Sequence, residues 1–206
     1  MSALKKLSRT LGQIAKGFAY DTPLGGFPVC QTVIAPDAAS SSSVLALTDL
    51  ADDETTLVTS GITDPDVYRT LRVVGNQSSV TGDVVVKGKD YSGQSIEETI
   101  ALNGTTAVAG VRPFASIDSI LLPTESSTAA GDKVSVGVSA VFGLQRPIKV
   151  VGDVKQLLID NGSGASLVVD TVAAKSAGDG TYATVTPTTA ANGAKNYIVF
   201  YDSYLL

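Results

Sequence analysis

Short runs of β-forming residues, separated by turns, dominate this sequence of 206 residues and predict strands rather than helices. From about residue 67 onward, runs rich in Val, Ile and Thr recur at intervals of about 8 to 15 residues, with Gly, Asn and Pro between them. The alternation in TGDVVVKGKDYSGQSIEETIALNG, residues 81–104, predicts a hairpin with its turn at residues 90–93 and with Val84 and Val86 facing inward. The whole pattern predicts an all-β fold, either an antiparallel β-sandwich or a jelly-roll-like barrel.

The sequence divides into three predicted parts. Residues 1–43 are expected to form an amphipathic helix and an extended arm, because residues 20–37 are rich in Pro and Gly and lack a helical period. Residues 44–145 are expected to form the β-sandwich body. Residues 146–206 either add strands to that body or form a small second β-lobe, and the pattern leaves both open. Their last run, NYIVFYDSYLL, is apolar on both faces, which predicts a central or fully covered strand.

The leader of the chain is amphipathic. Its apolar side chains recur at helical spacing and fall on one stripe: Leu4, Leu7, Leu11, Ile14 and Phe18. Residues 1–20 contain basic side chains and no acidic one. A helix of this length is marginal alone, so the stripe is expected to pack on its own domain, on a partner subunit or on a membrane surface. We predict the five stripe residues as partner contacts.

The apolar runs of the sequence are too short to predict a transmembrane helix. The leader also lacks the uninterrupted apolar region of a signal peptide, so we expect it to belong to the mature protein.

Few side chains in the chain could support catalysis. The sequence has no His, no Trp and one Cys. Without His, a His-containing zinc site and a Ser-His-Asp triad are both excluded. Cys30 has no second thiol with which to form an intrachain disulfide, and it is expected to be a small buried thiol. We therefore predict a non-enzymatic protein with no catalytic residue, no cofactor and no metal site.

Two further motifs resemble ligand sites only in part. The Gly-x-Gly of residues 160–166 lacks the third Gly and the following helix of a dinucleotide site, so it is expected to be a hairpin turn. The carboxylates of residues 51–56 lack the spacing of an EF-hand, so they are expected to form a solvated acidic loop. The formal net charge of −5 argues against general nucleic-acid binding.

Glu98 is the anomalous residue of the predicted hairpin. It shares a strand face with Ile96 and Ile100, whereas Glu97 points the other way, so the two carboxylates cannot converge on one glycosidic bond. A buried carboxylate needs a cation or hydrogen bonds. Candidate cations within the chain are Arg69, Arg72 and Arg112. A cation from a neighbouring subunit, or a bulge that turns Glu98 to the other face, would also resolve the anomaly. We predict Glu98 as a partner contact.

Three segments of the sequence occur in an order that is typical of one family of proteins. Residues 80–123 contain two strands of the form G-x-V-x-V-x-G-x-D-x-x-G and E-T-I-x-L-x-G, followed by F-x-x-I-x-S-I-x-x-P. Residues 134–150 and 180–206 provide the later segments, although Gln145-Arg146 interrupts the usual Gly-Leu-Pro. The order resembles that of virion structural proteins of tailed bacteriophages, over about residues 60–206.

The resemblance implies a non-enzymatic virion protein, and its leading form is a minor capsid protein of the decoration or cement type that bridges capsid subunits. The expected partners are the major capsid protein or other virion proteins and further copies of the chain, in virions assembled in the host cytoplasm. No direct contact with nucleic acid or membrane is expected. The alternatives are a neck, connector or tail component, and a receptor- or carbohydrate-binding β-module of a surface fibre. Deleting residues 1–40 is expected to leave the β-body folded and to weaken capsid binding.

Overall fold

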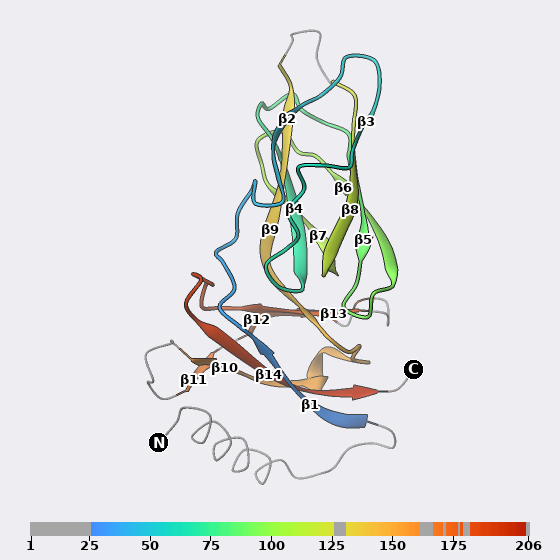
Figure 1. The fold of residues 1–206 in the computed structure, drawn as a ribbon. Coiled ribbons are helices and arrows are strands. Elements are labelled where there is room, and N and C mark those ends of the chain that lie inside the picture. Colours follow the sequence, from blue (N-terminus) through green and yellow to red (C-terminus); the bar gives the residue numbers. More distant parts are fainter. Residues whose placement is uncertain are drawn as a thin grey trace.

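The described part of the chain is an all-β structure. The computed structural model describes residues 26–125, 131–160, 167–170, 172–176, 178 and 182–204. These residues form fourteen strands in three antiparallel sheets and one short 3₁₀ turn, η1 (Val151–Asp153) (Figure 1). The all-β prediction is confirmed. The predicted N-terminal helix lies outside the described residues.

The upper unit of Figure 1 consists of two sheets that face each other across a hydrophobic core. The first sheet has the order β2 (Leu45–Asp49), β9 (Lys133–Leu144), β4 (Arg69–Gly75) and β7 (Val108–Phe114). The second has the order β3 (Thr56–Val58), β8 (Ser116–Leu122), β5 (Asp83–Lys89) and β6 (Ser95–Ala101). Val73 and Val136 of the first sheet and Val86 and Ile120 of the second are completely buried. The upper unit is therefore sandwich-like.

The lower unit surrounds a second hydrophobic core. Its main sheet has the order β1 (Gly26–Val33), β14 (Asn196–Tyr204), β10 (Val154–Asp160) and β11 (Val168–Asp170). The strands β12 (Val172–Ser176) and β13 (Ala183–Pro187) extend the sheet of β9, and side chains from β13 and from the end of β9 pack into the second core.

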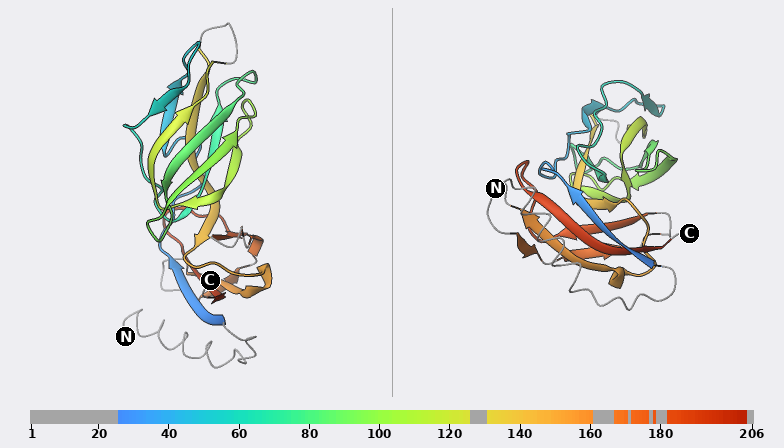
Figure 2. Two further views of the ribbon diagram at one scale, coloured as in Figure 1. Left: turned by 90° about the vertical axis from the view of Figure 1, so that its right-hand side faces the viewer. Right: turned by 60° about the horizontal axis from the view of Figure 1, so that its bottom comes forward.

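Strand β9 runs from one unit into the other. Its first half pairs with β2 and most of β4, and its last residues pair with β13 and with Arg69 of β4. The register between β4 and β9 shifts midway, because Arg69 pairs with Phe142 whereas Leu71 pairs with Val138. The extra β9 residues form a bulge, and a bulge bends the strand that contains it. Figure 2 shows the upper unit standing on the lower unit, with β9 passing between them.

Strands β5 and β6 form the hairpin that the alternation predicts. Val84 and Val86 are completely buried. In the turn, Asp90 Oδ1 accepts hydrogen bonds from the backbone N–H groups of Ser92 at 2.8 Å and Gln94 at 2.9 Å. Gly93 closes the turn at φ 82°, a conformation that favours glycine. The predicted hairpin and its phase are confirmed.

Strand β14 is covered on both faces, as its sequence predicts. Tyr197, Val199 and Tyr201 pack into the second core, and Ile198 and Phe200 belong to a separate cluster on the opposite face. The strand lies between β1 and β10 in the main sheet of the lower unit. The prediction of a central, covered strand is confirmed.

Part of the predicted arm is an integral strand. Residues 26–33 form β1 and pair with β14 over their full length. Pro28 is compatible with this position because β1 is an edge strand, where one row of N–H groups is not needed for pairing. Deleting residues 1–40 would remove this strand, whereas a truncation that ends at residue 25 or earlier keeps every described strand in the chain.

The expectation that Cys30 is buried is wrong, because its side chain is exposed. Side chains alternate along β1, and Gln31 and Val33 are the buried ones, which turns Cys30 to the other face. The partial burial that remains raises the pKa of the Cys30 thiol, which disfavours the reactive thiolate.

Candidate functional site

Glu98 lies on the buried face of β6, as predicted from its strand phase. Only 8% of its surface is exposed, and Ile100 beside it is also buried. The pairing of β6 with β5 is regular, with Glu98 opposite Val86, so no bulge in β6 turns the carboxylate outward. Its carboxylate must therefore find partners inside the upper unit.

The partners of Glu98 are backbone groups of β7. The register between β4 and β7 shifts between Thr70 and Arg72. The β7 residues opposite this point therefore do not pair regularly with β4. Glu98 Oε1 accepts hydrogen bonds from the N–H groups of Val111 at 2.5 Å and Arg112 at 3.2 Å. The carboxylate therefore accepts hydrogen bonds from backbone N–H groups of β7 that do not pair regularly with β4. Because β6 and β7 belong to different sheets, these bonds connect the two sheets of the upper unit.

Two opposing effects act on the Glu98 carboxyl. Burial raises its pKa, while the hydrogen bonds from Val111 and Arg112 and the charge of Arg112 act in the other direction. Within the described part of the chain, Glu98 Oε2 is buried without a hydrogen-bond partner. A Cβ atom on Gly110 would lie 2.4 Å from this oxygen, so only glycine leaves room for the carboxylate. The assignment of Glu98 as a partner contact stays a prediction, and the structure gives it a role within its own chain.

The other predicted site residues belong to the leader. They lie outside the described residues: Leu4, Leu7, Leu11, Ile14 and Phe18. Their assignment as partner contacts stays a prediction.

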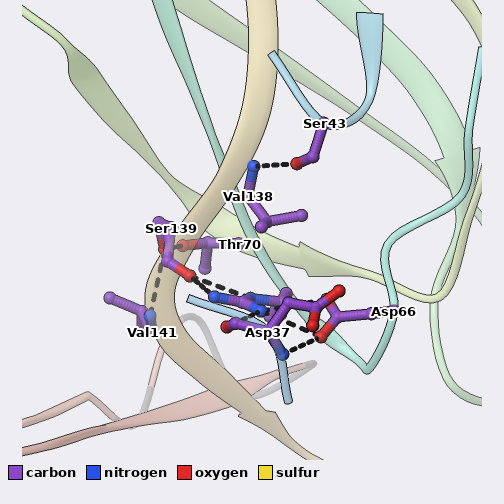
Figure 3. A network of polar contacts seen from close by, with 8 residues as sticks. Asp37, Ser43, Asp66, Thr70, Val138, Ser139 and Val141 are labelled. Carbon is purple, nitrogen blue, oxygen red and sulfur yellow. Dashed lines mark hydrogen bonds and ion pairs between the residues drawn. The ribbon is translucent and has the colours of Figure 1, made fainter. Parts of the chain in front are cut away.

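Arg69 is completely buried at the junction of the two units and does not pair with Glu98. Its guanidinium donates to the carbonyl oxygen of Ser139 from Nε, at 2.8 Å, and from Nη2. Nη1 donates to the carbonyl oxygen of Asp37 at 3.0 Å and to Asp66 Oδ1 at 2.9 Å (Figure 3). The guanidinium also lies 5.6 Å from the ring centroid of Phe142. Burial lowers the pKa of Arg69, and the carboxylate of Asp66 opposes this shift.

The Arg69 cluster holds the β9 bulge in place. Ser139, within the bulge, shares a hydrogen bond of 2.5 Å with Thr70 Oγ1 and accepts one from the N–H of Val141 at 3.0 Å (Figure 3). Asp66 Oδ2 accepts from the N–H of Asp37 at 2.7 Å, which ties the segment after β1 to the same point. A single buried cation thus joins three segments that are far apart in the sequence. In the sequence, only the spacing of three residues between Asp66 and Arg69 points to this ion pair.

A pocket of about 240 Å³ lies beside the β5–β6 turn, where the two units meet. Two tyrosines that are far apart in the sequence, Tyr68 and Tyr182, line it together with Arg112. The Tyr68 ring lies 5.8 Å from that of Tyr91, and the Arg112 guanidinium lies 5.2 Å from the ring centroid of Tyr182. Burial and the charge of Asp90 raise the pKa of Tyr68 to about 12, so its hydroxyl stays protonated at neutral pH.

Several sheet edges carry exposed apolar side chains. Among the described residues, β2, β3, β7 and β11 each pair with a neighbour on one side only. The exposed side chains on these four edge strands are Leu47 (52%), Leu57 (60%), Val111 (62%), Val168 (52%) and Val169 (65%). An edge strand offers unpaired backbone groups except where a side chain has bound them, as Glu98 binds the N–H of Val111, and exposed apolar side chains on such strands favour contact with another chain.

No group of three or more His, Cys, Asp or Glu side chains suited to a metal ion occurs among the described residues. Among the same residues, no helix has the length and hydropathy of a membrane span.

Comparisons with protein-family models, with curated proteins and with solved structures give no match to this chain. Its function is therefore proposed from its own residues.

Proposed function

We propose that this chain is a non-enzymatic structural protein of a tailed-bacteriophage virion, a minor capsid protein of the decoration or cement type. In this proposal the upper unit is a β-sandwich that binds the head and bridges capsid subunits. The sequence resemblance over about residues 60–206 supports the family, and the architecture of the described chain supports a role in assembly.

The observation that carries the proposal is the placement of exposed apolar side chains on edge strands. Leu57 on β3 and Val111 on β7 lie on edges of opposite sheets of the upper unit, and Val169 lies on an edge of the lower unit. A chain with several such edges can contact more than one neighbour at once. Strand addition at an edge combines backbone hydrogen bonds with pockets for alternate side chains.

The proposed mechanism is interfacial. Edge strands of one copy bind the major capsid protein or another copy, and each contact buries apolar area. On a symmetric shell the same contact recurs at every equivalent position, so avidity multiplies a modest affinity. The buried clusters at Glu98 and Arg69 keep the sheets and the two units in a fixed relation, which a bridging protein requires.

The test is a pull-down of purified protein on empty phage heads. Val111→Lys places a charge on an edge strand and is expected to weaken binding at least severalfold. Val150→Lys is the matched control, since Val150 is similarly exposed (58%, against 62% for Val111) but lies outside the strands. Circular dichroism establishes that both variants are folded. Equal binding by the two folded variants would overturn the edge-strand mechanism, and no binding by the unmodified protein would overturn the decoration assignment.

The number of copies per particle separates decoration from a place in the neck or tail. A decoration protein recurs with the capsid lattice, whereas a neck, connector or tail ring holds one small closed set of subunits. Quantitative mass spectrometry of purified virions measures this number. If the number of copies matches a single ring, the protein belongs to the neck or tail and is not a decoration protein.

The aromatic pocket supports a second candidate function, a carbohydrate-binding module of a surface fibre. The seven Tyr residues are scattered in the sequence, but the fold brings Tyr68 and Tyr182 to one pocket with Arg112, and the Tyr91 ring lies beside that of Tyr68. Aromatic faces and polar groups in one pocket suit a small polar ligand such as a sugar. Binding of host surface polysaccharide that Tyr182→Ala abolishes, and Val150→Lys preserves, would favour this function. No binding of the polysaccharide would exclude it.

A further inference from the structure

The main sheet of the lower unit has a second apolar cluster on the face turned away from the second core. Leu158 of β10 and Ile198 and Phe200 of β14 form this outer cluster, and Leu158 lies directly opposite Ile198. Their exposed fractions are only 4%, 3% and 9%. Leu167 is a described residue that packs against them.

The described strands do not account for this burial. Side chains of β13 pack into the second core, and in Figure 1 no described strand lies over the face of the sheet turned away from β12 and β13. One neighbouring leucine is too small to cover three large apolar side chains on an open sheet face. Among the described residues, no strand therefore forms a layer over this face of the sheet.

We propose that the leader, residues 1–18, covers the outer cluster of its own chain through the stripe of Leu4, Leu7, Leu11, Ile14 and Phe18. A predicted amphipathic helix needs an apolar surface, and the outer cluster is an apolar sheet face that the described chain leaves without a covering layer. This inference does not rest on the proposed virion function.

The position of the leader in the chain supports this occupant. The described chain begins at Gly26 with β1, an edge strand of this same sheet. A helix over residues 2–17 would be about 24 Å long, and the nine residues of β14 span about 30 Å, so the helix fits along the sheet. Residues 19–25 can extend over about 23 Å, which is enough to lead from the helix back to β1.

The charges on the two surfaces are also complementary. Side-chain alternation along β14 and β10 places Asp202 and Asp160 on the same face as the outer cluster. Lys155 also lies at this sheet and pairs with Asp202 at 3.2 Å. The basic residues of the leader fall mostly off its apolar stripe and can reach these carboxylates at the rim: Lys5, Lys6, Arg9 and Lys16.

The composition of the chain allows a direct test by fluorescence quenching. Cys30 is the single thiol, is exposed, and lies opposite Phe200 in the β1–β14 pairing, so it accepts a bimane label beside the outer cluster. The chain contains no Trp, so an introduced Trp is the one indole able to quench the label. Ile14→Trp and Phe18→Trp place an indole on the stripe. Gln13→Trp, on the opposite side of the predicted helix, is the matched control.

The proposal expects strong quenching with the stripe variants, much weaker quenching with Gln13→Trp, and no dependence on protein concentration. Equal quenching by all three variants, or none by any, would overturn it. The leader of another copy could also cover the cluster. A mixture of labelled chains without Trp and unlabelled Cys30→Ser chains with Phe18→Trp tests for this. Quenching in that mixture would assign the cover to the leader of another copy and overturn the assignment within one chain.

A second measurement applies if the Trp variants fold poorly. A truncated chain lacking residues 1–18 is expected to bind an apolar dye and to melt at a lower temperature. A synthetic peptide of residues 1–18 should reverse both effects when added, and the same peptide with Leu11→Glu and Ile14→Glu should not. A truncated chain that melts and binds dye like the full chain would overturn the proposal.

Discussion

Replacement of Glu98 by Ala tests whether a buried carboxylate holds the two sheets of the upper unit together. The change removes the acceptor of two hydrogen bonds, from the N–H groups of Val111 and Arg112. Hydrogen bonds to a charged group contribute about 1.5–3 kcal/mol each, and relief of the buried charge offsets part of their loss, so we expect the free energy of unfolding to fall by about 2–3 kcal/mol. For a chain of this size that fall corresponds to about 4–12 °C in Tm.

The adjacent residue provides the matched control. Glu97 is 54% exposed and pairs with Lys87 at 2.9 Å on the other face of β6. An exposed ion pair contributes at most about 1 kcal/mol, so Glu97→Ala should be nearly neutral. Urea denaturation of both variants, followed by circular dichroism, measures the difference. If Glu98→Ala is no more destabilising than Glu97→Ala, the carboxylate does not hold β7 and the reasoning is wrong.

The pH dependence of stability tests the environment of the same carboxyl. Burial raises the pKa of Glu98 above its ordinary value of 4.5, so the folded state holds its proton at a pH where the unfolded state has lost it. The contribution of Glu98 to stability is therefore most favourable below about pH 4.5 and declines as the pH rises through the raised value. The difference in unfolding free energy between the unmodified protein and Glu98→Gln should change in this direction. A difference that shifts the opposite way with pH would mean that the hydrogen bonds outweigh burial.

Two further variants test the other irregular points of the fold. Arg69→Met leaves the carboxylate and carbonyl groups at the junction without their cation, so it should lower the free energy of unfolding by about 3–5 kcal/mol in a urea titration. Arg72→Met should cost much less, because the Arg72 guanidinium is only partly buried. Equal effects of the two variants would contradict the central place of Arg69. Gly110→Ala crowds the Glu98 carboxylate and should lower the free energy of unfolding by about 1–3 kcal/mol. In a double-mutant cycle, Glu98→Ala should largely relieve this loss. Strict additivity of the two free-energy changes would refute the contact.

Side-chain alternation was sufficient to predict the regular strands. The β5–β6 hairpin and the covered strand β14 follow from periodicity alone. The hairpin has one clear apolar face, and β14 is apolar on both faces. Val84 and Val86 are buried for that reason, and the same phase correctly placed Glu98 on the inner face of β6. The partners of Glu98 were not predictable, because they are backbone groups of a strand that becomes irregular only when β7 meets β4.

Strand β1 shows why the edge of a sheet is hard to predict. Its Gly and Pro residues suggested an arm, but an edge strand tolerates Pro28 because one row of its N–H groups needs no partner. Its inward face includes Gln31, so the alternation of side chains along the strand turns Cys30 outward. Gln31 is buried because its amide donates to the carbonyl oxygen of Gly143 at 2.9 Å and accepts from the N–H of Gln145 at 2.8 Å. Those partners come from the far end of β9, more than a hundred residues away.

Gln31, Arg69 and Glu98 share one structural role. Each is a buried polar side chain that binds backbone groups where a strand bulges or ends, and each joins segments distant in the sequence. Buried polar groups of this kind specify one geometry, because an alternative arrangement would leave them without partners in an apolar setting. The polar residues of the interior thus fix the sheets and the two units relative to one another, while several of the exposed apolar residues lie on edge strands. A protein that bridges neighbouring subunits needs both properties, a fixed distance between its contact surfaces and edges able to accept another chain, and this combination favours the assembly proposal over a catalytic one.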